Sequence, residues 1–415
     1  MEDLKKFDYE HFDFEKLFQE VKESIKKPNI LVCGATGVGK SSLINAILNI
    51  DTMETAAEIG DDGRPKTRGV HLYSAENSTL NLYDSEGYEV GSLRQEYYKK
   101  MILDFIDDRI ENAPTDFISH IHEVWYCVSA GNKRFFDIDR DLILEIEKRH
   151  IPIMILITKV DEIDEDELAG LKSEIRRTFP KTAIYTYSTQ IPCASEYEDI
   201  YDEYVQTEEI TDWAIENIDE KLRGGILPAV KKGIKQKKQY IIKRTIPKYA
   251  GFAAAAVTAT SFVSVPFTDS AVLMPLQVKM SMEIINSYGI KAGIGNLLSG
   301  VVSTTAVSYV GRTISTQLIG IIPGIGGAAK AVVNVSVAAS VTATLGTAIA
   351  LVCEQYLKLC VDKEGKATMK FEEFFTAEKI KETLKYVSGH ESEFNLKEII
   401  EQAVKKAEEK RKNNL

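Results

Sequence analysis

The sequence predicts an α/β domain, with a mostly parallel sheet and helices on both faces, joined to an all-α C-terminal domain. In the first half, short apolar runs such as 30–33 and 153–157 are each followed by a loop and a helix-like segment. Alternation of this kind is typical of parallel strands joined by helices. In the second half, residues 249–353 are almost free of charge and are followed by charged amphipathic segments. We therefore expect two bodies of different structural class.

A phosphate-binding loop follows the first apolar run. Residues 34–41 read GATGVGKS, which matches the pattern GxxxxGKS between a strand and a helix-like segment, 42–48. Glycines let successive backbone N–H groups turn toward phosphate oxygens, a lysine adds a point charge, and a serine hydroxyl can ligate Mg²⁺. We expect this loop to bind a nucleoside triphosphate through Thr36, Gly37, Val38, Gly39, Lys40, Ser41 and Ser42.

A DxxG sequence, Asp84 to Gly87, follows the alternating strand 80–83. In this position the carboxylate holds the Mg²⁺ shell, and the Gly87 N–H reaches the terminal phosphate. Upstream, Thr67 lies in the sequence PKTRG and is the natural second hydroxyl ligand for Mg²⁺, with Thr52 and Thr55 as competitors. The predicted magnesium ligands are thus Ser41, Thr67 and Asp84, and the predicted catalytic groups are Lys40, Thr67 and Gly87.

The base is predicted by the sequence TKVD, which follows the apolar run 153–157. A carboxylate at a strand end accepts both hydrogen bonds from the N1 and exocyclic amine edge of guanine, so Asp161 is the expected guanine reader. Lys159 can lay its aliphatic stem along the base, and Thr158 begins the motif. Cys193 and Ala194 lie where backbone N–H groups could reach the guanine carbonyl.

With these elements in order, residues 29–198 resemble a GTPase domain of the TrmE, Era and septin type. The stretch AGNKRFF at 130–136 and the Thr67–Arg68 pair add a likeness to bacterial GTPases that carry a YcjF-like helical domain, and the layout also resembles immunity-related GTPases. The resemblance implies a P-loop GTPase fold, binding of GTP and GDP with Mg²⁺, and slow GTP hydrolysis.

Two departures from the resembled family concern hydrolysis. Tyr88 stands where many small GTPases have a water-orienting glutamine, and Gly37 stands where potassium-activated members have an asparagine. Positioning and charge neutralisation still give some turnover, so we expect a low intrinsic rate. Arg64, Arg68, a partner or a second copy of the chain are candidates for stimulation, although both arginines are also ordinary solvated loop charges.

Composition limits the remaining functions. A chain of 415 residues with 44% hydrophobic and 27% charged residues can bury more than one core. Its five cysteines form no CxxC, which fits reduced thiols in the cytoplasm, and its N-terminus has no apolar leader of a secretory peptide. His120 and His122 share one face of the expected strand 121–128, where packing is favoured over a metal site.

The chain is predicted to have five parts. An amphipathic N-terminal helix is expected at 1–28, capped by Asp13 and packed on C-terminal helices of the same chain in preference to a membrane. The others are the GTPase domain at 29–198, a helical connector with a basic segment at 199–248, the apolar YcjF-like region at 249–353 and a charged helical tail at 354–415.

The basic segment and the apolar region predict the partners. Basic residues crowd 231–248 although the whole chain has a net charge of −11, and they adjoin three small-residue stretches of nearly spanning length, 249–268, 292–311 and 331–353. Cations beside apolar sequence favour an anionic membrane, so we expect a cytoplasmic GTPase that associates with membrane peripherally or integrally. The alternatives are a soluble bundle that oligomerises, or contact with RNA or the ribosome.

One helix is predicted inside this apolar region, and two charged amphipathic helices are predicted after it. Residues 268–270 can cap a helix that ends at Gly289, and a second helix with apolar residues at 380, 384 and 387 ends at Gly389. Asn395 with Glu398 forms a capping-box pattern before a third helix.

Overall fold

The computed structural model describes residues 16, 20–21, 23–48, 69–73, 79–89, 94–191, 203–259, 270–290, 330–362 and 366–413. Its contacts divide the chain into two units. The α/β unit is Ile25–Gly233, and the helical unit comprises Met1–Ser24 with Ile234–Leu415. The predicted connector, 199–248, therefore contributes residues to both units, whereas the other predicted boundaries stay predictions.

The α/β unit is built on a six-stranded sheet of the described residues, with strand order β2-β3-β1-β4-β5-β6. Only β2 is antiparallel to its neighbour in this sheet, so the expected mostly parallel sheet is confirmed. The strands are β1 (Asn29–Gly34), β2 (Val70–Tyr73), β3 (Asn81–Ser85), β4 (Glu123–Ser129), β5 (Ile153–Thr158) and β6 (Ala183–Tyr187).

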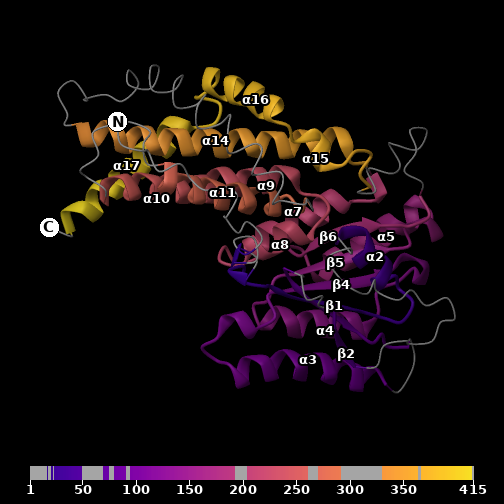
Figure 1. Cartoon of the computed structure of the whole chain (residues 1–415). Helices are drawn as coiled ribbons and strands as arrows, with labels where there is room; N and C mark the ends of the chain where they lie inside the picture. The colour runs from indigo at the N-terminus through magenta and orange to yellow at the C-terminus, as the bar shows by residue number, and fades with distance from the viewer. Residues whose placement is uncertain are drawn as a thin grey trace. The chain divides into compact units, whose positions relative to one another are not determined.

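Helices cover both faces of this sheet, as predicted. Figure 1 shows α3 and α4 side by side along one face, and α7 and α8 on the other. The helices are α2 (Lys40–Ile47), α3 (Gln95–Asn112), α4 (Asp137–Lys148), α5 (Glu165–Thr178), α7 (Thr207–Asn217) and α8 (Arg223–Ala229).

Burial explains why these segments form this sheet. Every residue of β1, β4 and β5 is buried, as expected for central strands covered on both faces. Helix α4 buries Ile138, Leu142 and Ile146, which recur at helical spacing on one face. Because β1, β3 and β5 run parallel in the sheet, their carboxyl ends lie at one edge, where the phosphate loop, the DxxG sequence and the TKVD sequence follow them.

The two histidines lie outside the strand in which they were predicted. β4 begins at Glu123, so His120 and His122 belong to the segment that enters it. His122 Nδ1 accepts the Asn29 N–H at 2.8 Å, and His120 Nε2 lies 2.8 Å from the Ala113 carbonyl oxygen. The imidazoles thus tie backbone segments together, and no group of three or more metal-ligating side chains occurs within the described ranges.

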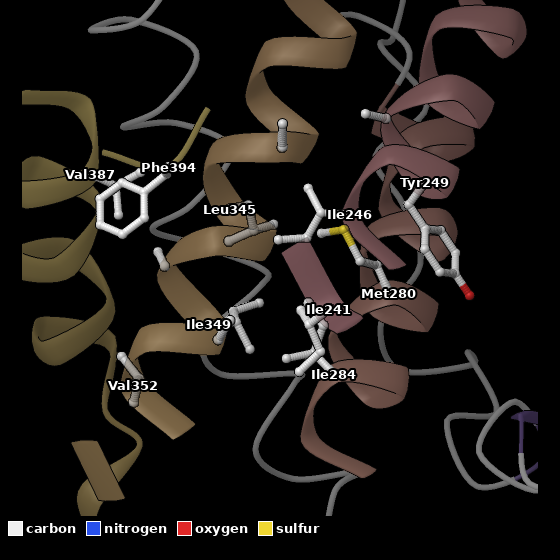
Figure 2. Packing of buried hydrophobic residues seen from close by; sticks show 14 of the residues in the cluster. Ile241, Ile246, Tyr249, Met280, Ile284, Leu345, Ile349, Val352, Val387 and Phe394 are labelled. Carbon is white, nitrogen blue, oxygen red and sulfur yellow. The ribbon is translucent and has the colours of Figure 1, made fainter. Parts of the chain in front are cut away.

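The helical unit packs around helices α10 and α14. α10 contacts both α14 and α17, and α14 also contacts α11 and α16. In Figure 2, Met280 is directed toward Ile246, and Leu345 and Ile349 extend from α14 into the same core. The helices are α9 (Ile234–Tyr240), a π-helical turn η6 (Ile241–Thr245), α10 (Ile246–Ala259), α11 (Ser270–Ser287), α14 (Lys330–Cys360), α15 (Phe371–Phe374), α16 (Ala377–Gly389) and α17 (Leu396–Asn413).

One described helix is long and apolar enough to cross a membrane. It is Val335–Cys360 within α14, and 94% of its most apolar window is buried inside the protein. The core helix of a soluble bundle passes the same test of length and composition, so this helix is weak evidence for insertion. The predicted stretch 292–311 lies outside the described residues, as do 260–268 of the first stretch.

The structure describes three helix boundaries that the sequence predicts. α11 ends before Gly289, whose φ of 73° is the left-handed conformation that follows many helices, and α16 ends at Gly389. The helix predicted to start at Asn395 is confirmed, because α17 begins at Leu396 and the Asn395 carbonyl accepts the Ile399 N–H, as an N-cap carbonyl does. Asn395 has a φ of 53°, whereas N-cap residues are typically extended, and the side-chain capping box with Glu398 stays a prediction.

The basic segment is not uniformly solvated. Lys237 is fully buried, and its Nζ donates to the Tyr288 carbonyl at 3.1 Å. Lys238 pairs with Glu354 at 2.9 Å, and Lys248 pairs with Glu283 at 2.7 Å. Some of the basic residues on which the prediction of a lipid-facing surface rests are therefore bonded to groups within the helical unit.

Candidate nucleotide-binding site

The phosphate loop connects β1 to α2, as its sequence requires. Gly34 has a φ of 139°, and a Cβ there would lie 2.2 Å from the Cys127 carbonyl oxygen, so only glycine fits beside β4. Gly39 has a φ of 95° and precedes the first residue of α2. Lys40 is buried, and its Nζ donates to the Gly34 and Ala35 carbonyls at 3.1 and 3.0 Å. The lysine is thus held over the loop whose amides would surround a phosphate.

The DxxG segment lies directly against this loop. The Thr36 N–H donates to the Tyr88 carbonyl at 2.9 Å. A Cβ at Gly87 would lie 2.3 Å from the Thr36 nitrogen, a distance that real Cβ contacts do not reach. Contact this close explains the glycine, and it brings the Gly87 backbone to the place where the outer phosphate of a bound nucleotide is expected.

Asp84 lies at the carboxyl end of β3 beside the loop. It is only 3% exposed, and within the described chain its Oδ1 has no hydrogen-bond partner. Burial raises the pKa of Asp84 to about 6, and the nearby Lys40 and His71 charges partly oppose that rise. An unsatisfied buried carboxylate oxygen is costly, so it marks a place where a cation or its water shell would be stabilised.

The guanine motif follows β5 at the same edge. The Thr158 hydroxyl donates to the carbonyl of Val38 and, at 3.2 Å, to the carbonyl of Val128. It therefore joins the phosphate loop to β4 and β5. Lys159 has a φ of 56° and its Nζ lies 3.4 Å from Glu162. Asp161 is exposed and accepts a hydrogen bond from the Ser188 hydroxyl.

Ser188 is the site residue that the sequence prediction missed. It comes directly after β6, and β6 pairs with β5 so that Tyr187 lies opposite Thr158. The Gln190 N–H donates to the Ser188 hydroxyl at 3.0 Å, which fixes the oxygen that holds Asp161. The signal in the sequence was the serine that ends the run 183–187. Cys193 and Ala194, whose backbone N–H groups were predicted to reach the guanine carbonyl, lie outside the described residues, as does Thr67.

Sequence comparisons identify the class of this site. Residues 1–91 match the family model described as RsgA GTPase. The chain is 27% identical over 166 residues to the probable GTP-binding protein EngB of Aquifex aeolicus, covering 39% of this chain and 82% of the relative. It is 26% identical over 210 residues to mouse Septin-14, covering 44% of this chain and 46% of the relative.

The α/β unit is a P-loop GTPase domain. The motifs, the sheet and these relatives agree on the class. The chain spans less than half the length of the septin that it matches. A crystal structure of a probable GTP-binding protein engB aligns with 46% of this chain and 99% of its own at 18% identity, with a TM-score of 0.32.

Within the GTPase domain, the structure brings the two halves of the predicted site to one sheet edge. Lys40, Asp84 and Gly87 surround the phosphate loop, while Thr158 links that loop to the strand that precedes Asp161. Gly37 is exposed, with a φ of 72°. The arrangement suits a ligand with a polyphosphate at one end and a purine at the other.

Proposed function

We propose that the GTPase domain binds GTP and GDP, hydrolyses GTP slowly and serves as a nucleotide-dependent switch. The observation that carries the proposal is the Thr158 hydroxyl on the Val38 carbonyl, with Asp161 three residues further on held by Ser188. A guanine reader and a phosphate cradle are thereby coupled through one side chain.

The residues present suit a magnesium ion. Ser41 is the second residue of α2, the unsatisfied Asp84 Oδ1 lies beside the loop, and oxygen donors of this kind are those that Mg²⁺ prefers. Thr67 is proposed as the further hydroxyl ligand. Bound there with nucleotide, the ion would neutralise charge on the outer phosphate oxygens.

The chain's own groups account for a slow reaction. The loop amides and Lys40 would bind the polyphosphate, and the Gly87 N–H would contact the terminal phosphate. Tyr88 does not replace a water-orienting glutamine, because its hydroxyl donates to Asp139 in the core. Hydrolysis then depends mainly on positioning, and a partner or second copy that supplied further charge would accelerate it.

Calorimetry with purified protein, magnesium and GTP, GDP or xanthosine diphosphate tests this proposal. The wild-type chain should bind both guanine nucleotides. Asp161→Asn should lose guanine preference and gain affinity for xanthosine diphosphate, whereas Asp166→Asn, an exposed carboxylate in α5, should behave as wild type. Absence of GDP and GTP uptake by the wild-type protein would end the proposal.

The helical unit is proposed to contact anionic membrane peripherally, under control of the nucleotide state. The exposed cations Lys235 and Lys243 support this part of the proposal, because basic side chains are attracted to anionic head groups. Vesicle flotation with protein loaded with GDP or a slowly hydrolysed GTP analogue tests it. Equal failure to float in both states on anionic vesicles would contradict it.

A second candidate is a soluble module that assembles with itself or another protein when GTP is bound. The burial of α14 favours this alternative, since a bundle with a satisfied core requires no lipid. Monodispersity without detergent, together with a nucleotide-dependent change in molar mass by light scattering, would support it. The likeness of the helical unit to a YcjF-like domain stays a prediction in either case.

A further inference from the structure

Tyr88 occupies an unusual place for a residue that follows a DxxG motif. Its side chain is 3% exposed, and its ring packs at 5.2 Å on the ring of Tyr98. Its hydroxyl donates to Oδ1 of Asp139 in α4. The side chain is thus anchored in the core of the GTPase domain, while its backbone carbonyl accepts the Thr36 N–H of the phosphate loop.

Asp139 is a buried carboxylate that accepts a second hydroxyl as well as that of Tyr88. It is 2% exposed, and its Oδ1 also accepts the Tyr126 hydroxyl of β4 at 2.7 Å. A buried carboxylate needs such donors, because burial alone strongly disfavours its charge. Two tyrosines from different elements therefore stabilise the same oxygen atom, and one of them, Tyr88, directly follows the DxxG sequence.

A second bond anchors the other side of the same segment. The Tyr98 hydroxyl in α3 accepts the Gly34 N–H at 2.9 Å and lies 3.1 Å from the Ser85 hydroxyl. Gly34 begins the phosphate loop and Ser85 is the second residue of DxxG. The phosphate loop is consequently fixed to α3 through Gly34, and the chain around Gly87 is fixed to α3 through Ser85 and to α4 through Tyr88.

These contacts leave little freedom at Gly87. Its backbone lies so close to Thr36 that no Cβ fits, and the residues on either side of the Glu86–Gly87 pair are bonded to buried partners. An amide that is already oriented loses less conformational entropy when it binds an oxyanion than one on a free loop.

We propose that Tyr88 is a positioning residue: through its bond to Asp139 it holds the Gly87 amide in register with the phosphate loop for the terminal phosphate. This inference rests on the proposed GTP binding. The buried bond between Tyr88 and Asp139 would thus help the domain to discriminate GTP from GDP, because only GTP has the phosphate that Gly87 would reach.

The test compares the affinities of GDP and the analogue GTPγS, with magnesium, in the full-length chain. Tyr88→Phe keeps the ring and removes only the hydroxyl. It should weaken GTPγS binding roughly tenfold, equivalent to about 1.4 kcal/mol, and leave GDP affinity within about twofold. Asp139→Asn keeps an acceptor oxygen, so its GTPγS affinity should be closer to that of the wild type than the affinity of Asp139→Ala.

Tyr126→Phe is the matched control. It removes a hydroxyl from the same carboxylate but leaves the DxxG segment attached, so its GTPγS to GDP affinity ratio should stay within about twofold of wild type. A purely structural role for the cluster predicts that Tyr88→Phe and Tyr126→Phe lower the melting temperature alike and leave both ratios unchanged. That result would overturn the proposal.

Hydrogen exchange on the wild-type protein gives an independent check that needs no variant. Peptides that span 84–88 should be protected already with GDP bound and change little with GTPγS. Rapid exchange of this segment in the GDP state would also overturn the proposal. A wild-type chain that bound neither nucleotide would instead refute the proposed function, so the two failures are distinct.

Discussion

Gly87→Ala is the sharpest test of the geometry at the phosphate loop. The added Cβ would lie 2.3 and 2.4 Å from the nitrogen and Cα of Thr36, and 2.6 Å from the carbonyl carbon of Ala35. All three are backbone atoms, so no rotamer change relieves the clash. Ordinary contact needs roughly 3.5 Å, so the two backbones must separate by about 1 Å. A hydrogen bond from the Gly87 amide to a terminal phosphate does not survive such a shift at full strength.

We expect Gly87→Ala to slow GTP hydrolysis roughly 100-fold, the usual loss for one oxyanion donor. GDP affinity should change little, since GDP lacks the phosphate concerned. Single-turnover phosphate release and GDP titration measure the two effects. Gly170→Ala is the control: nothing lies within 4 Å of its added Cβ, and it lies inside α5. Wild-type hydrolysis by Gly87→Ala would refute the close packing described here.

Three further outcomes are expected. Lys40→Ala should abolish measurable GTP binding by calorimetry; retention of wild-type turnover would contradict the phosphate-loop assignment. Burial raises the pKa of the Glu123 carboxyl well above its ordinary value of 4.5. The contribution of Glu123 to folding stability is therefore complete below pH 4.5 and is lost as the pH rises toward the pKa of this carboxyl in the folded protein. The wild-type melting temperature should therefore fall more steeply with rising pH than that of Glu123→Gln. Equal slopes of melting temperature against pH in the two proteins would exclude Glu123 as the cause. Gly346→Val should cost about 1–3 kcal/mol by chemical unfolding, because its Cβ meets Met280 and Ile246 at 2.9 and 3.0 Å.

The phosphate loop and the sheet were predictable because their signals are local. The glycines of 34–39 are required by backbone conformation and by close approach to β4, and the run 153–157 is apolar because β5 is buried on both faces. A pattern that depends only on residues close together in the sequence can be interpreted without knowledge of the fold. The end of α11 before Gly289 and the end of α16 at Gly389 were predictable for the same reason.

Ser188 and Asp139 were not predictable, because their roles depend on strand register and helix packing. Ser188 reaches Asp161 only since β6 lies in register beside β5. Asp139 is one acidic residue in a charged helix start, and the sequence does not say that it faces inward toward Tyr88 and Tyr126. The same sequence reasoning recognised Tyr88 as a departure but had no means of finding what it binds.

The basic segment shows that composition alone overstates the charge available to contact a membrane. Lys237 and Lys238 were counted as surface charge, yet one is fully buried and the other pairs with Glu354. The exposed Lys235 and Lys243 would contribute about 1 kcal/mol each near an anionic surface, roughly 2 kcal/mol together. That energy changes partitioning about 30-fold and is screened by salt. Because most of the apolar window of α14 is already buried, contact through these cations would be peripheral and readily reversed, as a nucleotide-controlled association requires.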